Sequence, residues 1–150
     1  PRCSSAAWRR FTLMSISVTL VGCQDPSDPG RAPATLVITR DGPATTGFAV
    51  RPPSTRVIPG TVILLGGDAF SDPGVTLRAS ARIVSSSGGS TLRLTVTSAK
   101  IRGLFPQTSW FYEYEVRVPV RAGEYQVEVS RKRDDGPTNV VTYSQRVVVP

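Results

Sequence analysis

The stretch from Tyr112 to Val129 reads YEYEVRVPVRAGEYQVEV, and it decides the fold. Apolar and polar residues alternate with a period of two on both sides of Ala122-Gly123. This alternation is typical of strands with one face buried and the other in water, and the Ala-Gly pair marks a turn. The stretch therefore predicts two consecutive half-buried strands, at 112–120 and 125–129.

The same period of two extends outward from this stretch in both directions. It predicts further strands at 75–83, 92–96 and 141–149, and shorter apolar runs indicate others at 36–38, 48–50 and 62–65. In 141–149 the residues expected inward are Val141, Tyr143, Val147 and Val149, with Gln145 as an anomaly among them. Turns are expected at Pro59-Gly60, Gly66-Gly67-Asp68, Asp72-Pro73-Gly74 and Ser87–Ser90. Seven or eight short strands with regular turns predict an all-β sandwich or barrel.

A local resemblance favours the sandwich. Residues 118–129 resemble the E–F corner of immunoglobulin-like domains, in which a Gly turn precedes a Tyr whose hydroxyl bonds to the corner backbone. Tyr125 takes the place of this "tyrosine corner" residue. The resemblance implies an Ig-like or fibronectin-III-like antiparallel β-sandwich over 34–150, without the Cys pair and strand-C Trp of antibody domains. An eight-stranded β-barrel is the alternative.

The N-terminal part resembles the export signal of bacterial lipoproteins. Arg9-Arg10 precede an apolar run at 11–21 that ends in the lipobox-like Leu20-Val21-Gly22-Cys23. The run is far shorter than the roughly 20 residues of a spanning helix. The resemblance implies a signal peptide at 1–22, Sec export, cleavage between Gly22 and Cys23, and lipid on Cys23. Two or more acyl chains there would hold the protein on a membrane.

The residues after Cys23 are polar and rich in Pro, so 23–33 is expected to be a lipidated, flexible tether. Cys3 would leave with the signal, and no pair of cysteines would remain for a disulfide. Gln24 after the Cys favours the outer membrane under the sorting rule of enterobacterial lipoproteins. We expect a lipid-anchored protein of the bacterial cell envelope, facing the periplasm or the surface.

Charge argues against a nucleic-acid partner. The formal charge is +7 over the whole chain, but Arg2, Arg9 and Arg10 lie in the expected signal, and 15 basic against 11 acidic residues leave +4 after it. The one basic cluster, Arg131-Lys132-Arg133, is followed at once by Asp134-Asp135. We interpret it as a solvated hairpin tip rather than a nucleic-acid or lipid patch.

The sequence contains few side chains that could act in catalysis. The chain has no His, which excludes Ser-His-Asp and Cys-His machinery and His-ligated metals. Glu113 and Glu115 share one strand face and make a carboxylate-dependent glycan hydrolase the enzymatic alternative, although alternation already explains them as solvated residues. Asp68 and Asp72 have the oxygens that Ca²⁺ prefers, but turn formation accounts for both. We expect no cofactor, no metal and no enzymatic activity.

The best candidates for ligand binding are the aromatic residues Phe105, Trp110 and Phe111 at one end of the expected sandwich, where such domains carry binding loops. Trp110 also suits a role as a cap on the core. The sequence favours a non-catalytic binding or scaffolding module that contacts an envelope or extracellular protein or glycan through loops or an edge strand. A structural subunit of an envelope complex is a further alternative.

Overall fold

The computed structural model describes residues 20–21, 30–45, 49–133 and 140–150, and ten strands lie in these ranges. In chain order they are β1 (Leu20–Val21), β2 (Arg31–Ala32), β3 (Thr35–Pro43), β4 (Ser54–Ile58), β5 (Thr61–Phe70), β6 (Val75–Ser86), β7 (Gly89–Lys100), β8 (Trp110–Pro119), β9 (Gly123–Arg133) and β10 (Val140–Val149). The described part of the chain is therefore all-β.

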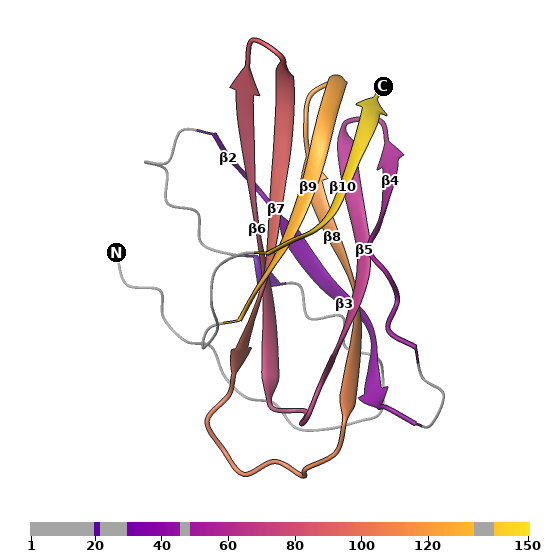
Figure 1. Cartoon of the computed structure of the whole chain (residues 1–150), viewed down its shortest axis with the longest axis vertical. Coiled ribbons are helices and arrows are strands. Elements are labelled where there is room, and N and C mark those ends of the chain that lie inside the picture. The colour runs from indigo at the N-terminus through magenta and orange to yellow at the C-terminus, as the bar shows by residue number, and fades with distance from the viewer. Residues whose placement is uncertain (1–19, 22–29, 46–48, 134–139) are drawn as a thin grey trace.

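The strands form two sheets that pack face to face (Figure 1). The order is β1-β3-β8-β5-β4 in one sheet, here called sheet A, and β10-β9-β7-β6-β2 in the other, sheet B. Alternating residues of both sheets fill the space between them, and the most deeply buried include Val62, Leu64, Leu92, Leu94, Val116, Val118, Val127 and Val129. Burying one face of each sheet drives the two together, so the architecture is the predicted sandwich.

The sheets do not close into a barrel. Their edges β4 and β10 approach each other, but the contact is made by side chains: the hydroxyls of Thr55 and Tyr143 lie 3.0 Å apart. Thr55 also donates a hydrogen bond of 2.6 Å to the Gln145 side chain. This contact explains why polar Gln145 interrupts the apolar pattern of the last strand.

One strand pair differs from the expected antiparallel arrangement. β7 and β9 run parallel, with Leu92 beside Val127 and Leu94 beside Val129, whereas the other described pairs are antiparallel. The reason lies in the connection. β8 follows β7 along the chain but lies in sheet A, so β9 returns to sheet B in the same direction as β7.

Two expected local features near the start of sheet A were wrong. Ala49 and Val50 lie outside the strands, and the strand of this region is β4, whose short alternating run is flanked by prolines (Phe48 lies outside the described residues). Gly66 and Gly67 do not form a turn but continue β5. A Cβ at Gly66 would lie 2.9 Å from the Tyr114 hydroxyl, so packing against a ring, not turn geometry, requires this glycine.

The two ends of the predicted domain also need correction. Val141 is 58% exposed, because a bulge between Val141 and Tyr143 reverses the face on which it lies. At the other end, Arg31 and Ala32 pair with β6, and Ala32 is buried in the core. Sheet B therefore includes two residues of the expected tether.

Candidate functional site

The loop at 101–109 connects β7 to β8 and forms one end of the sandwich, at the bottom of Figure 1. Its apolar side chains lie largely in solvent: Leu104 is fully exposed and Ile101 is 46% exposed. Phe105 is partly buried, and its ring occupies the space beside Gly74, where a Cβ would lie 2.3 Å from the ring. The base of the loop is held by a 2.8 Å hydrogen bond from the Ile101 amide to the Gly74 carbonyl. A fixed base thus supports an exposed aliphatic tip.

Trp110 lies where this loop enters β8. It packs against the edge of the core, and its indole Nε1 donates a hydrogen bond of 3.3 Å to Asp41. Trp110 therefore caps the end of the core, which is one of the two roles that the sequence indicates for it.

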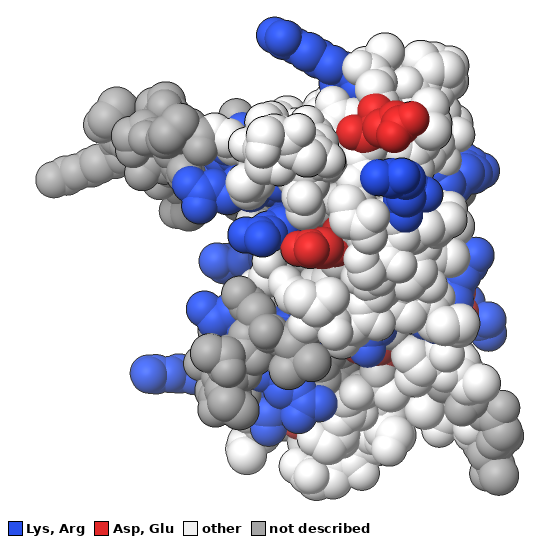
Figure 2. Space-filling view, turned by 45° about the horizontal axis from the view of Figure 1, so that its top comes forward, with Lys and Arg blue, Asp and Glu red and all other residues white. Residues whose placement is uncertain are grey.

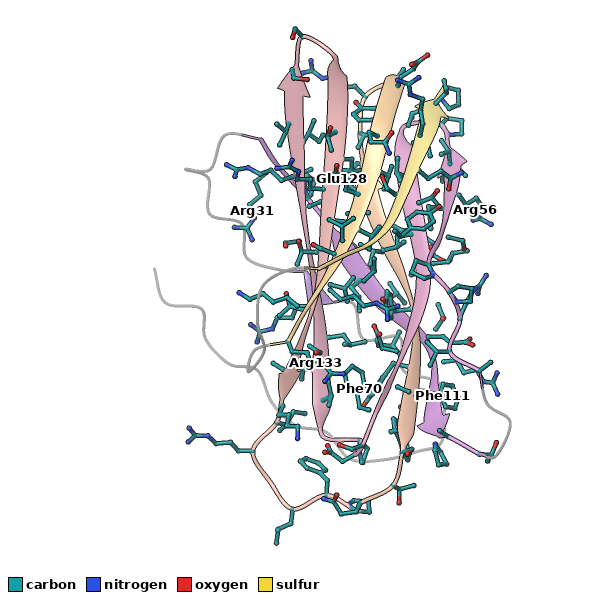
Figure 3. The ribbon with its side chains drawn as sticks, viewed as in Figure 1. Arg31, Arg56, Phe70, Phe111, Glu128 and Arg133 are labelled. Atoms are coloured by element: carbon teal, nitrogen blue, oxygen red, sulfur yellow. The ribbon has the colours of Figure 1, made fainter. Side chains whose placement is uncertain are left out.

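Phe111 lies elsewhere. It is on the outer face of sheet A, is 5% exposed, and has the guanidinium of Arg40 above its ring, 5.2 Å from the centroid. Figure 3 shows it at the side of β3, away from Phe70 and Arg133. The structure therefore does not bring Phe105, Trp110 and Phe111 onto one exposed surface, because alternation in β8 sends Trp110 and Phe111 to opposite faces.

A hollow of about 260 Å³ opens between the two sheets near the same end. Phe70 and Val75 form apolar parts of its lining, while Lys100 and Arg133 contribute cations and Asp72 a carboxylate. Asp72 is already engaged, since it accepts a 2.9 Å hydrogen bond from the Gly74 amide and lies 3.9 Å from Lys100. Sequence reasoning missed this hollow, although both the basic cluster and the Asp68–Asp72 segment contribute to it.

Beside the hollow, Arg131 joins the two sheets. Its guanidinium contacts the Asp68 carboxylate of β5 at 2.6 Å and the Gly67 carbonyl at 3.0 Å. Its Nε is buried without a hydrogen-bond partner among the described residues. The sequence predicts a solvated hairpin tip at Arg131, but in the structure this side chain points inward. The reason is that Arg131 continues the alternate positions of β9 that face sheet A, which are Tyr125, Val127 and Val129.

The Tyr114 hydroxyl completes this cluster by donating a 3.1 Å hydrogen bond to Asp68. Burial raises the pKa of Asp68 above its usual value, and the opposing pull of Arg131 is the smaller effect. Burial and the nearby Asp68 carboxylate raise the pKa of Tyr114, which keeps its hydroxyl protonated as a donor. The cluster is a polar connection between sheets. The Asp68 carboxylate, considered from the sequence for Ca²⁺, contacts both Arg131 and Tyr114.

Glu113 and Glu115 lie on the outer face of sheet A, as alternation predicts. Glu115 is ion-paired with Arg117, and Glu113 stands opposite Arg40 across the β3–β8 pair. Both carboxylates therefore lie beside arginines on the outer face of sheet A.

Tyr125 makes the contact that the corner resemblance implies. Its hydroxyl donates a 3.1 Å hydrogen bond to the Arg121 carbonyl, across the turn at Ala122-Gly123. The ring is buried at the end of the core. Tyr125 thus ties the β8–β9 crossing to sheet B.

Cys23 and Gly22, the expected lipidation and cleavage positions, lie outside the described residues, whereas the backbone of Leu20 and Val21 pairs with Thr35 and Leu36 of β3. Within the described ranges, no helix is long and apolar enough to cross a membrane. The same ranges hold no cluster of three or more His, Cys, Asp or Glu suited to a metal ion.

No family model, no curated protein and no solved structure matches this chain.

Proposed function

We propose that this chain is a non-catalytic, lipid-anchored binding module of the bacterial cell envelope, which contacts a protein partner through the loop at 101–109. The observation that carries the proposal is the exposed aliphatic tip of that loop, Leu104 and Ile101, on a base fixed to Gly74. Exposed apolar side chains on a rigidly held loop suit a protein contact, in which they become buried.

The position of the loop relative to the expected anchor supports this arrangement. The described chain enters sheet B through β2, near the β6–β7 hairpin at the upper end of Figure 1, whereas the loop at 101–109 lies at the lower end. A hollow lined by Arg31, Ser85, Ser90 and Arg121 marks the upper end independently. A chain tethered through Cys23 would therefore present the loop at the end remote from its point of attachment.

The domain does not depend on the residues that signal processing would remove. Among the described side chains, the core runs from Ala32 to Val149. Cleavage before Cys23 would take away β1, which contributes a two-residue pairing with β3. Loss of this short edge pairing leaves the two-sheet core intact, so the fold is compatible with the proposed lipoprotein.

The partner surface is tested by site-specific photocross-linking in intact cells. A photoreactive side chain replaces Leu104 in one variant. In the matched control it replaces Ile58, which is 40% exposed and ends β4 at the other end of the sandwich. We expect a discrete cross-linked protein product from position 104 and none from position 58. Equal products from both positions, or no product from 104, would overturn the proposal.

Protease treatment of the same cells locates the module. Cleavage in intact cells would place the loop outside and make an external protein the partner. Protection until the envelope is opened would place the partner in the periplasm.

A further inference from the structure

The outer face of sheet B carries a concentrated positive charge. The residues of this face are those that alternate with the buried ones in β2, β6, β7, β9 and β10. Its charged side chains are Arg31, Arg78, Arg82, Arg93, Lys132 and Arg146 against Glu124 and Glu128. Six basic and two acidic residues leave +4. Without Arg82, five basic residues against two acidic ones still leave a charge of +3 on this face.

The space-filling view shows how this charge is distributed. In Figure 2, Lys and Arg gather over the side of β2, β6 and β7, and acidic atoms form only small patches. Glu128 is committed to Arg93, with a 3.1 Å contact between its carboxylate and the arginine Nε.

The outer face of sheet A is different. Its carboxylates Glu113 and Glu115 alternate with cations on neighbouring positions, and Glu115 is ion-paired with Arg117 within the same strand. The concentration of positive charge is therefore specific to the outer face of sheet B.

The basic residues of sheet B also stand directly opposite one another. Arg31 pairs with Arg82 across β2–β6, and Arg82 pairs with Arg93 across β6–β7. The Cβ atoms of residues directly opposite one another on neighbouring strands are about 5 Å apart, so these cations form one continuous patch across β2, β6 and β7.

We propose that this face lies against the anionic headgroups of the membrane that holds the lipid on Cys23. The proposal rests on the lipid anchor of the proposed function. Arg31 follows Cys23 by eight residues, which span at most about 29 Å when fully extended. The anchored chain therefore brings this face within reach of its own membrane. The loop at 101–109, at the end of the sandwich, stays accessible to a partner.

A bilayer also suits the shape of the face. Five strands spaced about 4.8 Å apart form a broad surface, on which the cations lie across several strands rather than along one groove. Each basic residue near an anionic bilayer increases partitioning about fivefold, an effect that salt screens. Three such residues together then increase partitioning to the bilayer about a hundredfold.

Vesicle binding tests the proposal with the full chain carrying Cys23→Ser, which removes the lipid but keeps every other residue. Sedimentation with vesicles of phosphatidylglycerol and phosphatidylcholine is compared with sedimentation on phosphatidylcholine alone. The test variant combines Arg31→Ser, Arg78→Ser and Lys132→Ser. The control variant combines Arg51→Ser, Arg56→Ser and Arg121→Ser, three exposed arginines that lie outside the sheet B face and remove the same charge; Figure 3 shows Arg56 on the opposite side of the molecule from Arg31.

We expect the parent chain to prefer the anionic vesicles, and the test variant to lose about a hundredfold in partitioning where the control loses less than tenfold. The apolar segment at 11–21 is common to all three chains and cancels in the comparison. Equal losses in the two variants, or no preference for anionic vesicles, would overturn the proposal. Salt-dependent binding to DNA or to an anionic polysaccharide, without a preference for anionic vesicles, would assign the face to a polymer and overturn it too.

Thermal melting of each variant accompanies the assay, and Arg78→Ser alone provides a milder change for which we expect about a fivefold loss. The anchor is tested separately, by palmitate labelling of Cys23 in cells. Failure of that labelling would remove the anchor while leaving the vesicle result to stand by itself.

Discussion

The contact between Arg131 and Asp68 joins sheet B to sheet A, and Arg131→Met tests what it contributes to stability. Methionine retains the apolar stem of arginine but removes the 2.6 Å contact to Asp68 and the 3.0 Å hydrogen bond to the Gly67 carbonyl. Exposed ion pairs contribute about 0–1 kcal/mol, and breaking a fully buried pair costs about 3–5 kcal/mol. The side chains of Arg131 and Asp68 are 33% and 15% exposed, which is intermediate. We therefore expect a loss of about 2 kcal/mol in the free energy of unfolding at pH 7.

The loss should depend on pH. Burial raises the pKa of Asp68 in the folded chain above its reference value of 3.8, and Arg131 opposes that rise. The folded chain therefore holds the Asp68 proton more tightly than the unfolded chain. The stability that this proton contributes is fully present below pH 3.8 and is lost as the pH rises through the folded pKa. Without Arg131, the pKa of Asp68 in the folded chain rises further. Protonation of Asp68 therefore begins to stabilise the variant at a higher pH than it stabilises the parent.

Urea unfolding of the parent, Arg131→Met and a matched control at pH 7 and pH 5 measures both effects. The control is Lys132→Met, one residue along β9, exposed and on the outer face. We expect the gap between Arg131→Met and the parent to narrow at pH 5, while Lys132→Met follows the parent at both pH values. A gap that stays constant with pH, or a control as destabilised as Arg131→Met, would refute the assignment of a cross-sheet contact to Arg131.

Three further changes test the corner, a close approach and the anchor. Tyr125→Phe should lower the free energy of unfolding by about 1 kcal/mol, because the Arg121 carbonyl loses its 3.1 Å partner; an unchanged melting temperature would contradict the corner. Gly66→Ala should cost about 2 kcal/mol, since the new Cβ would lie 2.9 Å from the Tyr114 hydroxyl, and wild-type stability would show that the ring has room to move. Cys23→Ala should abolish palmitate incorporation and lipoprotein-type processing, which immunoblotting and labelling detect; a labelled variant would disprove the lipid site.

Alternation along the strands predicted most of the residues that fill the core. In β8 the residues that alternate with Glu113, Glu115 and Arg117 are all buried, as a period of two requires. They are Tyr112, Tyr114, Val116 and Val118. The same alternation accounts for Phe111 on the outer face. It did not predict that Arg40 covers the ring, because that contact crosses to β3 and depends on the register between two strands far apart in sequence.

The features that sequence reasoning missed all depend on such long-range pairings. The bulge in β10 moves Val141 into solvent, and nothing in the apolar run itself marks the extra residue. Arg131 continues the inward face of β9 beyond its apolar residues, but whether an inward arginine finds a carboxylate depends on Asp68 of the facing sheet. The period of two predicts the face of a strand on which a residue lies. The residue that it contacts in the facing sheet depends on the topology.

The parallel pairing of β7 and β9 shows what the topology requires of the candidate site. β7 ends at Lys100 and β9 begins at Gly123, at opposite ends of the sandwich, so the chain must return the full length of a strand before β9 can pair in parallel. β8 provides that return within sheet A. The loop at 101–109 must then cross from one sheet to the other before β8 begins, outside any strand pairing. The strand order explains why this loop is exposed, but it does not explain why the exposed tip is apolar. The apolar side chains of Leu104 and Ile101 are therefore the argument for a partner at this loop.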